Sequence, residues 1–119
     1  MEEEAEGHSA RNELESWVAA LALKPYLHAI GDPTRLTMLR ELARTGERPV
    51  LDLARILGLS QPLTSWHLRI LRQAGLVSTR RAGRQILCHL DYGRLGEWQA
   101  QLDAFMRVEP APQDRAKEQ

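Results

Sequence analysis

The stretch LSQPLTSWHLRILRQAGL, residues 59–76, has the pattern of a helix that follows a tight turn. Ser60 is a favoured N-cap residue, and Pro62 falls in the first turn, where its missing N–H does no harm. Gly75 stands just past the last periodic apolar residue, where helices commonly end. The sequence therefore predicts a helix over residues 61–74.

The two sides of this predicted helix differ in chemistry. Thr64, Leu68 and Leu71 recur at helical spacing and form an inward-facing stripe. The other side is polar and basic, with one large ring, and carries Pro62, Ser65, Trp66, Arg69 and Arg72. An exposed indole on a short basic helix indicates that this side contacts another molecule.

The neighbouring segments complete a supersecondary pattern. A short helix is predicted over residues 50–57, and a glycine ends it just before the next helix begins, which is a helix-turn-helix arrangement. Downstream, residues 76–81 and 85–90 have the composition of two strands, with a hairpin turn at Ala82-Gly83. A helix-turn-helix followed directly by an arginine-rich hairpin is a winged helix.

Helices are also predicted near both ends of the chain. The first covers residues 12–30 and is broken or kinked at Pro25. A second begins at Asp32-Pro33, a capping residue followed by a favoured first helical residue, and runs to Gly46. The last covers residues 92–106, where apolar side chains again recur at helical spacing.

The predicted fold class is mainly α with a small β-hairpin. The length of 119 residues predicts one domain. We expect a winged helix-turn-helix domain for DNA binding and dimerisation over residues 11–108. It lies between a disordered acidic N-terminus, residues 1–10, and a flexible C-terminal tail, residues 109–119.

Composition excludes several classes of protein. No apolar run approaches the roughly 20 residues that span a membrane, and the acidic N-terminus lacks the apolar core of a signal peptide. The single cysteine excludes an internal disulfide and is typical of a reducing, cytoplasmic environment. No nucleophile elbow, P-loop or zinc-protease motif occurs, so we expect no catalytic residues and no enzymatic activity.

Charge is distributed unevenly along the chain, although the net charge is zero. Residues 1–20 hold six glutamates against one arginine, whereas residues 60–94 hold six arginines against one aspartate. Affinity for a polyanion depends on the local patch and not on the sum. The basic half of the chain therefore favours double-stranded DNA as a partner.

Three motifs, in order, resemble one known family. They are DPTRLTMLREL (residues 32–42), DLARILGLSQPLTSWHLRILRQAGLV (52–77) and RRAGRQILCHLD (80–91). Together they resemble the ArsR/SmtB family of winged-helix bacterial repressors, over roughly residues 26–95. The resemblance implies a homodimer joined by its first and last helices and bound to operator DNA. It also implies an effector, because much of the family releases DNA when a metal or metalloid binds.

The apolar stripes of the first and last helices exceed what one small protomer can cover, which favours symmetric pairing. The predicted dimer interface contains Leu14, Trp17, Leu21, Leu95, Trp98, Leu102 and Phe105.

The basic side of the central helix and the hairpin predict the DNA contacts. The predicted residues are Gln61, Pro62, Thr64, Ser65, Trp66, His67 and Arg69 on the helix, Arg80, Arg81 and Arg84 on the hairpin, and Arg35 at an earlier helix start. Gln can pair with adenine and Arg with guanine through two hydrogen bonds. Two orientations of Trp66 stay open. Its ring packs on a thymine methyl or sugar, or it tilts inward and fills space beside Thr64.

The metal ligands expected from the resemblance are missing. The positions of the family's Cys-x-Cys pair hold Pro49 and Leu51, and those of its site on the last helix hold Tyr92, Arg94, Phe105 and Val108. Such residues do not supply the thiolates, imidazoles or carboxylates that borderline and soft metals need. We therefore predict no metal and no cofactor.

Cys88, His89 and His28 are the remaining candidates for chemistry. Cys88 and His89 are adjacent on a strand and point to opposite faces, so they do not readily chelate one ion. An inert buried thiol is the favoured interpretation of Cys88, and a redox role would need a cysteine from a second subunit. For His28 a structural role is favoured over an effector site.

The predicted function is a dimeric, sequence-specific DNA-binding transcriptional regulator. It is interpreted as a repressor released by an effector whose identity the sequence does not give. A different hypothesis is a protein-interaction module, in which the apolar first and last helices bind another protein and the basic face is incidental. The concentration of arginines on the predicted helix and hairpin favours the first hypothesis.

Overall fold

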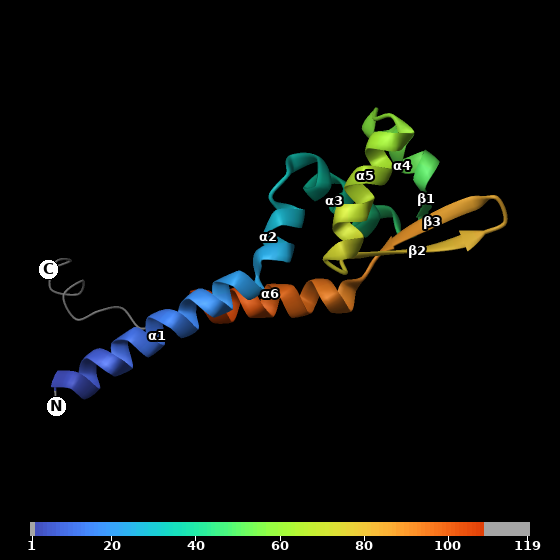
Figure 1. Cartoon of the computed structure of the whole chain (residues 1–119). Helices are drawn as coiled ribbons and strands as arrows, with labels where there is room; N and C mark the ends of the chain where they lie inside the picture. Colours follow the sequence, from blue (N-terminus) through green and yellow to red (C-terminus); the bar gives the residue numbers. More distant parts are fainter. Residues whose placement is uncertain (1, 109–119) are drawn as a thin grey trace, which may run out of the picture.

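A computed structural model describes residues 2–108 of the chain (Figure 1). Within these residues the elements are α1 (Glu2–Ala22), α2 (Lys24–Ile30), α3 (Pro33–Thr45), β1 (Arg48–Pro49), α4 (Val50–Leu57), α5 (Gln61–Gln73), β2 (Val77–Ala82), β3 (Gln85–Leu90) and α6 (Tyr92–Met106). The helix-turn-helix is α4 and α5, and the wing is the β2–β3 hairpin. None of the helices described is long and apolar enough to cross a membrane.

The break predicted at Pro25 is present. α1 ends at Ala22, and α2 begins two residues later with Pro25 in its first turn. The predicted disorder of residues 1–10 needs correction, because α1 already begins at Glu2. This stretch is rich in Glu and Ala, which are good helix formers, and acidic residues are favoured near a helix N-terminus. The predicted C-terminal tail lies outside the described residues.

Side-chain caps start three helices, and two of these caps were predicted from the sequence. Asp32 Oδ2 accepts a hydrogen bond from Arg35 N at 3.1 Å, and Ser60 Oγ accepts one from Leu63 N at 3.3 Å. Asp91 Oδ1 likewise accepts from the backbone at the start of α6. These bonds satisfy N–H groups that a helix leaves unpaired at its first turn. Gly58, with φ of 66°, closes α4 in the left-handed conformation and permits the short turn into α5.

The sheet has three antiparallel strands in the order β1-β3-β2. The hairpin β2–β3 was predicted, but its turn lies one residue later than expected, because Ala82 still pairs with Gln85. Gly83 occupies the turn with φ of 63°. β1 was not predicted, since two residues that include a proline carry no alternating pattern. It pairs with β3 and fixes the root of the wing against the end of α3.

The core lies between α2, α3, α4, α5 and the sheet. Its largest fully buried side chains are Met38, Leu42, Leu53, Leu71, Leu76, Thr64 and Cys88. From α6, Trp98 stacks on Tyr26 with ring centroids 5.4 Å apart and donates from Nε1 to Ala74 O at 2.8 Å. Trp98 thereby attaches the last helix to the winged-helix body.

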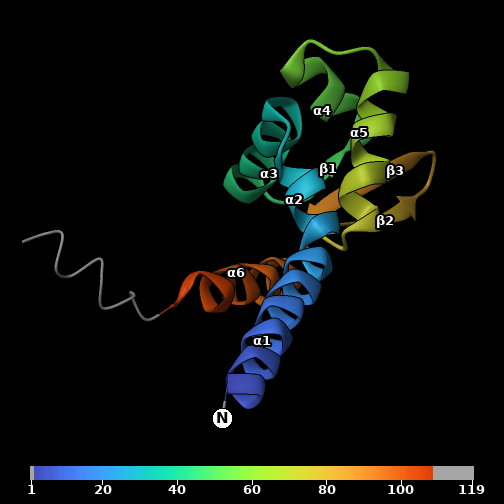
Figure 2. The same ribbon diagram turned by 60° about the vertical axis from the view of Figure 1, so that its left-hand side comes forward.

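The first helix runs away from this body (Figures 1 and 2). Several of its apolar side chains are exposed in the protomer: Leu14 and Trp17 are each 63% exposed, and Leu21 is 49% exposed. An apolar stripe of this size on a projecting helix is the kind of surface that a partner covers.

Candidate nucleic-acid interface

The outward side of α5 is the one predicted from the sequence. Gln61, Pro62, Ser65, Trp66, Arg69 and Arg72 are all exposed. Trp66 is 50% exposed, so its ring does not fill the core. Of the two orientations left open by the sequence, the structure has the outward one.

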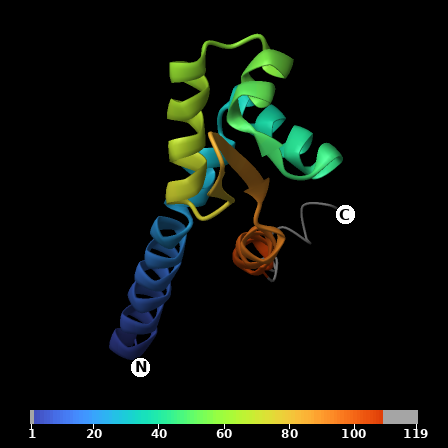
Figure 3. The same cartoon turned by 90° about the vertical axis from the view of Figure 1, so that its right-hand side faces the viewer.

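A hollow of about 270 Å³ lies between α5, the wing and the start of α4. Figure 3 views the molecule from the tip of the wing, with α5 alongside the hairpin. Three arginines line the hollow, namely Arg72 from α5 and Arg81 and Arg84 from the wing, together with the polar side chains of Gln61 and Ser65. Two successive elements, α5 and the wing, thus present cations and hydrogen-bonding groups to one concave surface, which suits a phosphodiester backbone.

Arg80 does not line this hollow. Successive residues of a strand point to opposite faces, and Arg80 lies on the face away from Arg81. Its guanidinium donates to Glu47 from Nε at 2.9 Å and from Nη2 at 2.6 Å. These hydrogen bonds hold the pKa of the Glu47 carboxyl below its ordinary value. His89 Nδ1 lies 3.5 Å from the same carboxylate. The wing arginines therefore divide into two near the hollow and one in an ion pair.

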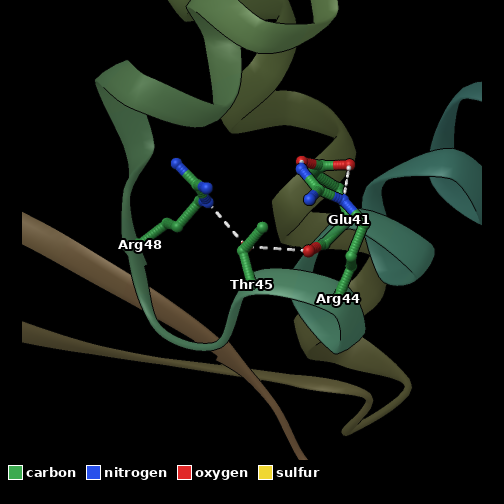
Figure 4. Close-up of polar contacts among 4 residues, drawn as sticks. All are labelled: Glu41, Arg44, Thr45 and Arg48. Atoms are coloured by element: carbon green, nitrogen blue, oxygen red, sulfur yellow. Dashed lines mark hydrogen bonds and ion pairs between the residues drawn. The ribbon is translucent and has the colours of Figure 1, made fainter.

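The corner that carries Glu47 is held by side chains at the end of α3 (Figure 4). Arg48 Nε donates to Thr45 Oγ1 at 2.6 Å, and Thr45 Oγ1 donates to Glu41 O at 2.8 Å. Arg44 forms an ion pair with Glu41 and lowers the pKa of that carboxyl. Arg48 is thus engaged in a hydrogen bond within the protein, where it positions β1 and the root of the wing.

Three residues predicted to contact DNA are buried, which corrects the sequence-based prediction for them. Thr64, Arg35 and His67 are 0%, 5% and 6% exposed. Thr64 Oγ1 donates to Ser60 O at 2.9 Å, within the first turn of α5. Arg35 and His67 bond to each other beneath the helix surface, at 3.2 Å between Nη1 and Nδ1. Periodicity did not reveal this contact, because it joins residues far apart in the chain.

Cys88 is fully buried, as the favoured interpretation of the sequence has it. Its thiol donates to Arg48 O at 3.3 Å, and burial raises the pKa of the thiol to about 11. A thiol with so high a pKa is almost entirely protonated near neutral pH, which disfavours both metal binding and oxidation. His89 is partly exposed on the other face of β3.

No three His, Cys, Asp or Glu side chains come together as a metal site within residues 10–108, the part of the chain whose side chains the structure describes. Of the positions where the family resemblance places metal ligands, Pro49 and Leu51 lie at the junction of β1 and α4. The others are Tyr92, Arg94 and Phe105, which belong to α6, and Val108, which follows it. His28 is exposed, and its carbonyl oxygen accepts a hydrogen bond from Arg35 Nη2 at 2.9 Å. The backbone of His28 therefore helps to hold the buried side chain of Arg35.

The residues predicted for the dimer interface fall into two groups. Leu14, Trp17 and Leu21 of α1 and Phe105 of α6 are exposed. Leu95, Trp98 and Leu102 are partly buried because they pack against the core of their own protomer. The first group is free to contact a partner, and the second mainly attaches α6.

Comparison with known proteins agrees with this architecture. Residues 32–79 match the family described as "Bacterial regulatory protein, arsR family". The chain is 44% identical over 72 residues to the HTH-type transcriptional regulator NmtR of Mycobacterium tuberculosis, covering 60% of this chain and 59% of NmtR. The chain therefore spans little more than half the length of that relative.

Solved structures extend the likeness over more of the chain. A "Possible transcriptional regulator for arsenical resistance" superposes with a TM-score of 0.62 at 35% identity, covering 69% of this chain and 84% of that one. A homodimeric winged helix-turn-helix DNA-binding domain from Mycobacterium bovis superposes with a TM-score of 0.61 at 27% identity, covering 77% and 87%. These likenesses confirm the predicted winged helix-turn-helix fold, and the chain belongs to the ArsR family of bacterial regulatory proteins.

Proposed function

We propose that this protein is a dimeric, sequence-specific DNA-binding transcriptional regulator that acts as a repressor. The observation that carries the proposal is the hollow shared by α5 and the wing, where Arg72, Arg81 and Arg84 converge beside the exposed side of the helix. A dimer bound across two half-sites represses by occupying promoter DNA that polymerase needs. The names of its relatives, which are transcriptional regulators, support the same function.

In the proposed complex α5 enters the major groove. Gln61, Ser65, Trp66 and Arg69 are exposed on one side of the helix, in reach of base edges. Arg69 suits guanine and Gln61 suits adenine, because each pairing forms two hydrogen bonds. The Trp66 ring supplies an apolar surface for a thymine methyl or a sugar. Arg81 and Arg84 approach phosphates or a narrow minor groove.

Selection of bound sequences from random DNA with the purified protein tests this function directly. We expect a strong inverted repeat, because a two-fold symmetric dimer reads two identical half-sites. A chain that enriches no sequence and shifts no DNA in a gel would instead favour the protein-interaction module, in which the apolar helices bind another protein.

The wing arginines provide a matched test of how the protein holds DNA. Arg84→Ala removes a cation at the hollow, so it should weaken binding to all DNA sequences similarly. The slope of log affinity against log salt concentration should fall by about one unit for one lost phosphate contact. Arg80→Ala is the control on the same hairpin, and because Arg80 is paired with Glu47 we expect the slope to stay nearly unchanged. Equal losses in the two variants would show that Arg80 leaves Glu47 when DNA binds.

The proposed dimer forms through the exposed residues of α1 and of α6. Light scattering at micromolar concentration should give twice the 13.5 kDa mass of one chain. Trp17→Glu places a charge on the projecting helix and should shift the protein toward monomer. Leu51→Glu is the control, since Leu51 is also exposed but lies on α4. A wild-type protein that stays monomeric would contradict the dimer. In the dimer the two α5 helices should lie about 34–36 Å apart, one turn of DNA.

We propose that the effector is not a metal bound at either of the two sites where the family resemblance places metal ligands. Zinc, cadmium or arsenite should leave the affinity of the protein–DNA complex nearly unchanged in titrations, because those positions lack ligands. Cys88→Ser is the control for thiol chemistry, which the pKa of about 11 already disfavours near neutral pH. Stoichiometric, reversible release of DNA that survives Cys88→Ser would contradict this prediction, with His28 and His89 the first ligands to test.

A further inference from the structure

Arg35 is a buried cation whose guanidinium is bonded mainly to the end of a helix. It is 5% exposed, and Asp32 accepts the backbone N–H of Arg35 and not its guanidinium. Arg35 Nε donates to Ala29 O at 2.8 Å, and Nη2 donates to His28 O at 2.9 Å. Both oxygens belong to the last turn of α2, where carbonyl groups are unpaired and the helix dipole is negative. The buried charge is thereby compensated by backbone oxygens.

The third partner of Arg35 is His67 on α5. Arg35 Nη1 lies 3.2 Å from His67 Nδ1, and both side chains are buried. Arginine has donors and no acceptor, so Arg35 Nη1 donates and His67 Nδ1 accepts in this hydrogen bond. The guanidinium therefore joins the end of α2 to the inner side of α5.

The exposed ring of Trp66 rests on this pair. The Trp66 and His67 rings meet edge to face, with centroids 4.9 Å apart and planes at 64°. The Cζ atom of Arg35 lies 5.9 Å from the centroid of the Trp66 ring. Edge-to-face contacts and cations beneath an indole are both favourable, so the inner side of the ring is held while the outer half stays exposed.

We infer that Arg35 and His67 are positioning residues that hold the Trp66 ring in its DNA-facing orientation and connect it to the end of α2. This inference rests on the proposed function, since the orientation matters only if the ring contacts DNA. α2 follows directly on α1, the helix proposed for the dimer, so the same contacts connect the dimer helix to the DNA-contacting ring. A ring already fixed in place loses less conformational freedom when DNA binds.

The orientation is tested first in the free protein, without DNA. The protein is labelled with 5-fluorotryptophan, and its fluorine NMR resonances are assigned by single replacement of Trp17, Trp66 and Trp98 with phenylalanine. Arg35→Met keeps the length of the side chain but loses its charge and donors. We expect the Trp66 resonance to shift and broaden while the Trp98 resonance, which reports on the core, stays in place. Arg40→Met, on the exposed side of the same helix, is the control and should move neither.

His67→Phe is a second variant, in case Arg35→Met does not fold. It keeps a ring beside Trp66 but removes the accepting nitrogen, so the Trp66 resonance should again shift. An unchanged Trp66 resonance in a folded variant of either kind would overturn the inference. This arm needs no DNA, so it stands even if the chain binds none and the proposed function fails.

Binding to the selected operator then shows whether Arg35 acts through Trp66. Arg35→Met should lower affinity about three- to tenfold, the scale of fixing one side chain. The salt dependence should stay unchanged, because a buried guanidinium contacts no phosphate. Adding Arg35→Met to Trp66→Ala should cause no further loss. Additive losses, or a salt slope reduced by about one unit, would overturn the inference and make Arg35 a direct or independent determinant.

Discussion

Trp98→Ala is expected to lower the free energy of unfolding by about 3–5 kcal/mol, the usual cost of truncating a large packed ring. The ring stacks on Tyr26 with planes within 6°, and its Nε1 hydrogen bond to Ala74 O spans α6 and the end of α5. The variant loses both contacts and leaves space between the last helix and the core. Urea denaturation followed by far-ultraviolet circular dichroism measures the loss.

Trp66→Ala is the matched control, because it removes the same ring from a surface that is 50% exposed. We expect its stability to fall by about 1–2 kcal/mol, because the ring loses its contacts with His67 and Arg35, and its operator affinity to fall as well. Both variants are measured at several protein concentrations, since a dimer gains apparent stability with concentration. If Trp66→Ala were as unstable as Trp98→Ala, the outward placement of Trp66 would be contradicted.

Local signals predicted most of the fold. The caps at Asp32 and Ser60, the helix stop at Gly58 and the break near Pro25 each act over three or four residues, and all are present in the structure. Such signals are readable because the groups that form them are neighbours in the chain. β1 was missed because its two residues are held by pairing with β3, some forty positions away.

The composition of the candidate site was less predictable, because helical spacing assigns a side chain to a face but not to a partner. His67 was predicted to contact DNA, yet it faces Arg35 across 32 positions of sequence. Arg80 and Arg81 are adjacent arginines that the sequence does not distinguish. The strand places them on opposite faces, and Arg80 is the one that forms an ion pair with Glu47. Trp98 was predicted to belong to an apolar stripe at a dimer interface, but its ring stacks on Tyr26 of the same protomer. In each case a contact between distant segments decides the role.

Arg69→Ala is expected to cost roughly 1–3 kcal/mol of binding free energy on the selected operator, and to relax the preference at one base pair. Arg69 is exposed on the same side of α5 as Ser65 and Trp66, where a guanidinium reaches base edges once the helix lies in the major groove. The loss should be largest on the operator and small on unrelated DNA, because a base contact is made only at the matching sequence.

Arg55→Ala is the matched control for Arg69→Ala. Arg55 is also an exposed arginine of the helix-turn-helix, but it belongs to α4. Its Nη1 lies 3.6 Å from Asp52 Oδ1. We expect its replacement to leave the sequence preference unchanged, since it lies outside the exposed side of α5. Binding isotherms on the operator and on single-base variants, all at one salt concentration, separate the two effects. If Arg69→Ala weakened all sequences alike and lowered the salt slope, Arg69 would contact phosphate, and the reading of bases would rest on Gln61, Ser65 and Trp66 instead.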